Sequence, residues 1–500
     1  MEGVARWSQR GAVVAMAAIA ACATVPPCPE RGGPVWRELT SEHFVLRSDL
    51  PLDEATDVLR TLEETRAAML ASVWRGEAGP LGRTQAIALS SPREFVAFTG
   101  PLIGGMHLQH PPFRPTLVLG AADATQSAAK HEVAHELAFS VLPVEPPWYA
   151  EGLAGFLQTI RYDRAQGDAY VGEPAEDLYR YFSTGGPMDL DRLLGRVPDD
   201  PFQAVQFYAT SWLLVHYLFN KRFDGWQRLT DRLARLEPGR AAFLAEFPDL
   251  SGDGLYRTLT DYARGGQYTV LRPRVAPWTA TPRVRTMADT EAHGARAYLY
   301  WALRDRNDEI TDATLRTEID EGLHGPAPSV DALAVAFYGP DAHVKQRRAE
   351  LAALATRTHP ESWMSWLMAA DGESNGLLAK RGDLFRGLAK APDEPEILLR
   401  LATVDAQEGQ WDDAVALTNR ILGAGLVHHG LWLLHAQALR ETGHCAMADR
   451  WAASLSAYLP LAEVPAIAVL EERPCQEGAD HRPSDAGTTA TAAPASEPVR

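Results

Sequence analysis

The chain has 500 residues, which is longer than one ordinary domain and predicts two or three domains. Hydrophobic residues make up 46% and charged residues 23%, the balance of a globular chain that can bury a core. The formal net charge of -17 at pH 7 repels phosphate backbones. The composition therefore argues against nucleic acid as a partner.

The first 22 residues have the pattern of a bacterial secretion signal. Arg6 and Arg10 make the start basic, and residues 11–21 are small and apolar but too few to span a bilayer. They lead into Ile19-Ala20-Ala21-Cys22, which resembles the lipobox of lipoproteins, whose cysteine is acylated and anchors the mature chain. Ala23 then implies, by the same resemblance, an outer-membrane anchor facing the periplasm. A plain signal peptide or an uncleaved anchor is the alternative.

The next segments predict alternating strands and helices. Strands are expected at 44–46, 85–89 and 116–119. Helices are expected at 52–73, from Ser91-Pro92 onward, and from about Thr125 onward. This order predicts a small α+β lobe, which continues into a mostly helical region.

The whole chain divides by composition and periodicity. We expect a signal peptide at 1–22, a Pro/Gly-rich linker at 23–35, one domain at 36–266, an extended linker at 267–290, a helical domain at 291–465 and a disordered tail at 476–500.

The helical domain contains a repeat. Ala402, Gly409 and Ala414 recur as Ala436, Gly443 and Ala448, each 34 residues later (436 − 402). Paired helices with this period resemble the tetratricopeptide repeat, most clearly over 395–460, which implies binding of protein partners. A generic helical bundle is the alternative. An oxidising envelope would also permit a Cys445–Cys475 disulfide, which the sequence leaves open.

One motif indicates metal chemistry. His131-Glu132-Val133-Ala134-His135 has two histidines four apart, so on a helix both imidazoles can reach one ion. Glu132 lies about 100° around the helix from His131, and its carboxylate can contact a metal-bound water. Zinc in a catalytic site needs a third protein ligand and one open position. A surface helix with two incidental histidines is the alternative.

A second helix can supply that third ligand. Pro147 suits the first turn of a helix, and Glu151 follows on it, 16 residues after His135 (151 − 135). Gly152 would let the two helices approach closely. Glu151 could instead be an acidic residue that complements the helix dipole. Glu145 is a rival ligand, but it precedes two prolines and has no helix to hold it.

These two motifs carry a family resemblance. HEVAHEL followed by PPWYAEGLAGF resembles the gluzincin metallopeptidases, and more closely the peptidase MA-like group. Segments 36–46 and 208–218 also resemble that domain, so the resemblance extends over about residues 36–265. It implies a small mixed-sheet lobe with a helical zincin-type domain, a Zn²⁺ cofactor, the ligands His131, His135 and Glu151, and hydrolysis of peptide bonds.

The role of Tyr208 follows from the same resemblance. Tyr208 is expected to donate a hydrogen bond to the developing oxyanion. A tyrosine of the hydrophobic core is the alternative.

Three features fit this interpretation less simply. Glu136 follows the second histidine, where zinc peptidases usually have an uncharged residue; it either points to solvent or signals altered activity. His107 and His110 are expected on a surface loop because Gly and Pro surround them. The strand at 116–119 could pair with an extended peptide substrate if it is an edge strand; an interior strand is the alternative.

The sequence thus favours a zinc-dependent peptidase, lipid-anchored in the cell envelope, that acts on peptide or protein substrates. Glu132 is expected to take the proton of the metal-bound water. The alternative is a catalytically inactive, metallopeptidase-like envelope scaffold that binds protein partners through its helical repeats.

Overall fold

The computed structural model describes residues 29–458 and residue 475, apart from 75–81, 100–103, 121–126, 143, 267, 305–311, 325–326, 340–346, 373–375 and 424–428. The expected signal peptide with Cys22 and the tail at 476–500 lie outside the described residues. Among the helices that are described, none combines the length and the apolar character needed to cross a membrane.

A six-stranded mixed sheet organises the first part of the chain. Its strands, in spatial order, are β4 (Gly105–Leu108), β5 (Thr116–Gly120), β3 (Thr84–Leu89), β2 (Phe44–Ser48), β1 (Arg37–Thr40) and β8 (Arg283–Thr286). β3 is parallel to β2 and β5, whereas β4, β1 and β8 are antiparallel to their neighbours. β2, β3 and β5 are the three predicted strands, and the predicted α+β class is confirmed.

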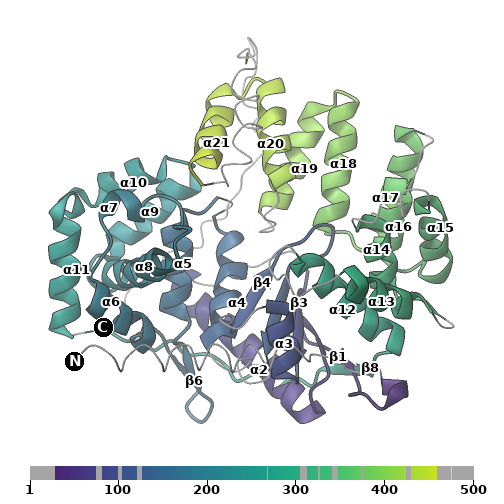
Figure 1. Cartoon of the computed structure of the whole chain (residues 1–500). Coiled ribbons are helices and arrows are strands. Elements are labelled where there is room, and N and C mark those ends of the chain that lie inside the picture. Colours follow the sequence, from purple (N-terminus) through teal and green to yellow (C-terminus); the bar gives the residue numbers. More distant parts are fainter. Residues whose placement is uncertain are drawn as a thin grey trace, which may run out of the picture.

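Helices cover both faces of this sheet (Figure 1). They are α2 (Leu52–Met69), α3 (Pro92–Thr99), α4 (Ser127–Phe139) and α12 (Asp289–Leu303). Successive side chains of a strand point to opposite faces. Leu117 and Leu119 accordingly belong to the core that contains α2 and α4, whereas Val118 belongs to the core that contains α3 and α12.

The region after α4 is mostly helical. It contains α5 (Pro147–Leu157), the hairpin β6 (Arg161–Asp163) and β7 (Asp168–Tyr170), then α6 (Glu176–Gly185), α7 (Leu190–Leu193), α8 (Pro201–Lys221), α9 (Phe223–Ala234), α10 (Gly239–Glu246) and α11 (Asp253–Gly265). Short turns of 3-10 helix lie at Pro29–Arg31 and Pro248–Leu250, and a π-helical turn at Leu70–Trp74 extends α2.

The Pro-rich stretch expected as an extended linker returns to the sheet. Leu271 and Arg274 form isolated bridges to Val171 and Asp168 beside the β6–β7 hairpin. Residues 283–286 then form β8, which pairs with β1 from Arg37↔Thr286 to Thr40↔Arg283. The stretch therefore contributes the last strand of the sheet, which the sequence analysis did not anticipate.

The remaining helices are α13 (Asp312–Leu323), α14 (Val330–Tyr338), α15 (Arg348–Thr358), α16 (Trp363–Gly372), α17 (Leu377–Lys390), α18 (Pro395–Gln407), α19 (Trp411–Leu422), α20 (His429–Glu441) and α21 (Cys445–Tyr458). The pair α20–α21 repeats the pair α18–α19 with an offset of 34 at both ends of its first helix (429 − 395 and 441 − 407). Gly409 and Gly443 make the two turns with φ of 76° and 78°, in the left-handed region that favours glycine. Cys445 and Cys475 form a disulfide, which ties residue 475 to the start of α21.

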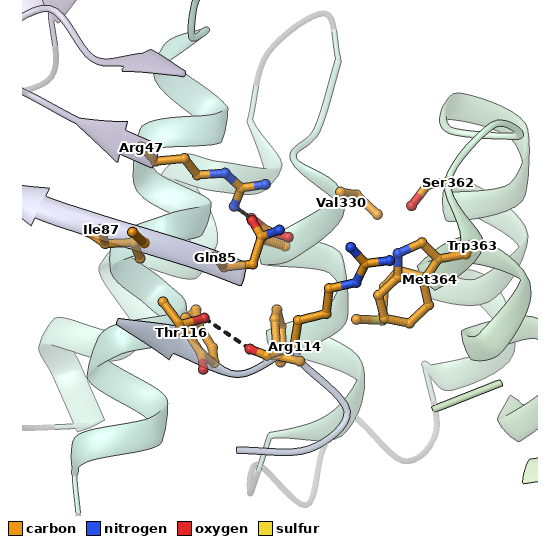
Figure 2. A pocket seen from close by; sticks show the side chains of 13 residues that line it. Arg47, Gln85, Ile87, Arg114, Thr116, Val330, Ser362, Trp363 and Met364 are labelled. Carbon is orange, nitrogen blue, oxygen red and sulfur yellow. Dashed lines mark hydrogen bonds and ion pairs between the residues drawn. The ribbon is translucent and has the colours of Figure 1, made fainter. Parts of the chain in front are cut away.

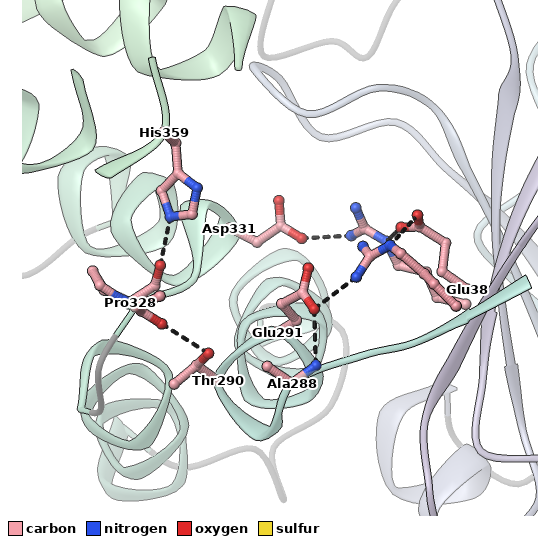
Figure 3. A network of polar contacts seen from close by, with 10 residues as sticks. Glu38, Ala288, Thr290, Glu291, Pro328, Asp331 and His359 are labelled. Carbon is pink, nitrogen blue, oxygen red and sulfur yellow. Dashed lines mark hydrogen bonds and ion pairs between the residues drawn. The ribbon is translucent and has the colours of Figure 1, made fainter. Parts of the chain in front are cut away.

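Ion pairs join the sheet to the helical domain. Arg47 on β2 binds Glu38 on β1 at 3.2 Å and also Asp331 on α14. Arg285 on β8 binds both Glu38 and Glu291 at 2.8 Å, and Figure 3 shows these carboxylates at the seam. The sheet and the first helices of the helical domain are thus held together by charge as well as by apolar packing.

A cavity of about 160 Å³ lies at the same seam (Figure 2). Arg47, Arg114 and Trp363 are among the residues that line it, and Arg114 also binds Glu394 at the start of α18 at 2.7 Å. None of the lining residues belongs to the predicted metal site.

Candidate metal centre

The predicted metal ligands converge from two neighbouring helices. His131 and His135 lie on α4, and Glu151 lies on α5. The two Nε2 atoms are 3.1 Å apart, and Glu151 Oε2 lies 3.3 Å from that of His131 and 3.8 Å from that of His135. Among the described residues, these three form the one group of side chains whose donor atoms could hold a metal ion.

This group fits the size and chemistry of a zinc site. Donor atoms at 2.0–2.1 Å from a tetrahedral zinc lie about 3.3 Å from one another. The separations of 3.1, 3.3 and 3.8 Å are close to that value, so one ion could bind with small movements. The side chains of His131, His135 and Glu151 are 22%, 13% and 23% exposed, which leaves the centre open to solvent on one side. Two imidazoles and a carboxylate are a typical catalytic set, with a fourth position for water.

Gln158 orients His131 by a contact with Nδ1, the ring nitrogen that does not face the other two predicted ligands. His131 Nδ1 lies 3.2 Å from the Gln158 side-chain oxygen, which can accept its hydrogen and leave Nε2 facing the other ligands. Gln158 caps the C-terminus of α5, seven residues after Glu151, and so lies two turns along the same face. The sequence analysis missed this residue, although the seven-residue spacing is a signal that could have indicated it.

The charges of these three side chains influence one another. Burial opposes a charge on His131, but the carboxylates of Glu151 and Glu132 outweigh it and raise the pKa of His131 to about 9. Burial, assisted by the neighbouring His131, lowers the pKa of His135. Burial also opposes ionisation of Glu151, yet the two imidazoles outweigh it and lower the pKa of Glu151. At pH 7 these shifts favour a protonated His131 beside an ionised Glu151.

Glu132 lies beside this group without belonging to it. Its Oε2 accepts the main-chain N–H of His107 on β4 at 2.9 Å. Its Oε1 makes no hydrogen bond with any described residue. One oxygen of the carboxylate is thus anchored while the other is available to a water, as the predicted role requires.

Glu136 is turned away from the metal group and is buried. It accepts a hydrogen bond from the Thr84 hydroxyl at 3.1 Å, and its second oxygen pairs with Nε2 of His107. The interpretation of Glu136 as a residue that points to solvent is wrong, because only 7% of its side chain is exposed. It is also too well satisfied by these two partners to act as a metal ligand.

The prediction that His107 is a surface loop residue is wrong as well. His107 lies in β4 with its side chain 6% exposed, and although burial opposes the charge, Glu136 raises the pKa of His107. His110 is half-buried, with its ring 4.2 Å from that of Trp301. The strand has only four residues, and the surrounding Gly and Pro residues favoured the prediction of a loop.

The edge of the sheet beside α4 is β4. The strand expected to meet a substrate at 116–119 is β5, which lies between β4 and β3 and is therefore an interior strand. β4 has β5 on one side, and on its other side the His107 N–H meets Glu132 of α4.

Tyr208 lies on α8, on the side of the metal group. Burial and the negative charges of Glu151 and Glu132 raise the pKa of Tyr208 to about 12, so its hydroxyl is neutral at pH 7 and can donate a hydrogen bond. Ser211, one turn later on α8, contacts Gly152 next to Glu151. In the described structure the Tyr208 hydroxyl has no hydrogen bond to the metal group.

Glu145, the rival ligand, stays outside the group. Both of its carboxylate oxygens are buried without a hydrogen-bond partner in the described part of the chain. Burial, with the charge of Glu151 nearby, raises the pKa of Glu145 well above its usual range. Both effects favour the protonated form of Glu145.

Comparison with known proteins assigns no family to this chain. No model of a protein family matches this chain, and no curated protein has significant similarity to it.

Proposed function

We propose that this protein is a zinc-dependent peptidase. The observation that carries the proposal is the convergence of His131, His135 and Glu151 within 4.8 Å, with Glu132 anchored beside them by one oxygen. Two imidazoles, a carboxylate and a free carboxylate oxygen are the parts that metal-assisted hydrolysis needs. The mixed sheet followed by two metal-binding helices is in keeping with the zincin-type fold expected from the sequence.

Zinc held by these three side chains would supply a Lewis acid that lowers the pKa of a bound water. Glu132 would take through Oε1 the proton of the water whose oxygen bonds to the scissile carbonyl carbon, and would pass that proton to the amine nitrogen as the C–N bond breaks. Tyr208, neutral and half-buried, donates its hydroxyl hydrogen to the oxygen of the scissile carbonyl. Gln158 holds the ring of His131 in the orientation that the reaction requires.

The substrate in this proposal is a peptide or a protein, as expected from the sequence. The proposal also retains a lipid anchor at Cys22 in the bacterial envelope. The paired helices α18–α21, with their 34-residue offset, support a tetratricopeptide-like domain that binds protein partners.

The test combines metal analysis with cleavage assays. The purified full chain is expected to hold one zinc and to cleave fluorescein-labelled casein. Glu132→Gln is expected to retain zinc and to lose cleavage by roughly a factor of 100 or more, because the general base is gone. Glu54→Gln, at an exposed carboxylate on α2, is the matched control and should behave as wild type.

Two results would contradict the proposal in different ways. A wild-type chain that takes up no zinc would remove the metal centre. Zinc at one per chain without cleavage of casein or of a broad peptide library would instead favour the inactive scaffold.

A further inference from the structure

We propose that Thr84, Glu136 and His107 form a buried chain of side chains that positions Glu132, so that Glu136 is a positioning residue of the catalytic centre. The inference rests on the proposed function. It also explains the acidic residue after the second histidine, which is unusual for a zinc peptidase.

The contacts are continuous from the sheet to the general base. The Thr84 hydroxyl, at the start of β3, donates to Glu136 Oε1 at 3.1 Å. Glu136 Oε2 pairs with Nε2 of the His107 ring. The main-chain N–H of the same His107 donates to Glu132 Oε2 at 2.9 Å.

Two carboxylates of α4 therefore hold a single residue of β4. Glu132 and Glu136 are four residues apart and lie on one face of the helix. Glu132 binds the main chain of His107, and Glu136 binds its ring. Two like charges at this spacing would repel each other on a bare helix, and the donors of His107 offset that repulsion.

The strand cannot shift easily along the helix. A Cβ atom on Gly105 would lie 3.2 Å from the Ala128 Cβ, so β4 and α4 are in close contact two residues before His107. The side chains of His107 and Glu136 are 6% and 7% exposed, so little water competes for their pairing. The pairing of the His107 ring with Glu136 adds to the pairing of β4 with β5 in holding the His107 N–H, and that N–H holds one oxygen of Glu132.

The consequence for catalysis concerns the free oxygen of Glu132. With Oε2 anchored, rotation of the carboxylate is restricted, so Oε1 would keep one orientation for the attacking water. Partners that orient a catalytic group without touching substrate commonly affect activity roughly 10–100-fold. Loss of the Glu136 pairing should therefore reduce turnover while leaving the three metal ligands in place.

The test compares two Glu–His pairs, of which the control pair is partly exposed at its histidine. Glu136→Leu removes both bonds of Glu136 and is expected to lower kcat for casein roughly 10–100-fold, with KM and zinc content little changed. Glu136→Gln keeps the shape and an acceptor oxygen and should restore most of kcat. The control is Glu63→Leu, which removes the pairing of Glu63 on α2 with His43 at 2.7 Å. This variant is expected to have a lower melting temperature and an unchanged kcat.

A spectroscopic readout does not depend on the choice of substrate. In the cobalt-substituted protein, the pH midpoint of the absorption change reports ionisation of the metal-bound water. We expect the midpoint of Glu136→Leu to move from that of wild type toward that of Glu132→Gln, and that of Glu63→Leu to stay at the wild-type value.

The outcomes separate this inference from the proposed function. Failure of the wild-type chain to bind cobalt would remove the metal centre itself. Cobalt binding with the same midpoint and the same kcat in Glu136→Leu as in wild type would overturn the positioning role alone. Equal losses of kcat in Glu136→Leu and Glu63→Leu would assign the effect to general destabilisation and would also overturn it.

Discussion

Gly152 on α5 lies directly against the main-chain carbonyl of Ser211 on α8. A Cβ atom at Gly152 would be 2.5 Å from Ser211 O and 2.6 Å from Val215 Cγ2, closer than real Cβ atoms come. The two helices can pack at this distance only because residue 152 has no side chain. Glu151 precedes Gly152, so the same contact sets where the proposed third metal ligand lies relative to α4.

Gly152→Ala should therefore disturb the metal site as well as the packing. The added methyl group forces α5 away from α8, which is expected to cost roughly 1–3 kcal/mol of stability. Displacement of Glu151 should lower zinc affinity roughly 10-fold or more. Competition with a zinc chelator and a thermal melt measure the two effects.

The control is Gly155→Ala on the same helix. A Cβ atom there would lie 3.3 Å from Leu178 Cδ1 and from Trp212 Cβ, a tight contact but a longer one than those at Gly152. We expect a smaller loss of stability and wild-type zinc affinity. If Gly152→Ala also binds zinc as wild type does, the contact with Ser211 does not position Glu151.

The choice between Glu151 and Glu145 as third ligand can be tested directly. Glu151→Ala should reduce zinc from one per chain to a small fraction, since two imidazoles alone leave the ion poorly held. Glu145→Gln should keep zinc, because its carboxyl group is outside the donor set. Above pH 5 it should be at least as stable as wild type, because Glu145 has no hydrogen bond to another described residue and its burial opposes ionisation, which raises its pKa. Metal analysis after dialysis gives the answer, and the reverse pattern would make Glu145 the ligand.

The sequence indicated the ligands of this centre better than it indicated their surroundings. The HExxH spacing and the helix that starts at Pro147 are local signals, and they suffice to predict which side chains can share an ion. β2, β3 and β5 could be predicted because each is a short run of mostly apolar residues with strand propensity.

The surroundings depend on pairings over longer distances. β4 has four residues in a Gly/Pro-rich stretch, and β8 lies in a segment that resembles a linker, so neither strand has a local signal. The pairing of His107 with Glu136 joins residues 29 apart and depends on the register between β4 and α4. No pattern within a single helix or strand indicates such a register.

Zinc uptake should release a proton. At pH 6 the raised pKa of His131, about 9, means that its ring is protonated in the metal-free centre. A ring bound to zinc through Nε2 must be neutral, so binding displaces that proton, whereas His135 and Glu151, with lowered pKa values, contribute little. The apparent zinc affinity should accordingly rise with pH between 6 and 9.

Calorimetric titration with zinc in buffers of different ionisation enthalpy measures the proton count. About one proton per zinc at pH 6 is expected for wild type. Glu151→Gln should bind zinc more weakly and release less than one proton, because the carboxylate no longer holds the charge on His131. A proton count near zero in wild type would contradict the assigned state of His131.

Tyr208→Phe tests whether the hydroxyl on α8 takes part in the reaction. A donor to the developing oxyanion acts mainly in the transition state, so kcat should fall roughly 100-fold while KM and zinc content stay near wild type. Tyr149→Phe is the matched control: its hydroxyl lies 3.1 Å from the Thr230 hydroxyl in the core, and its loss should cost roughly 1 kcal/mol of stability without changing kcat. Steady-state kinetics and thermal melts on both variants distinguish the roles. Wild-type kcat in Tyr208→Phe would make Tyr208 a core residue and leave the oxyanion to another donor.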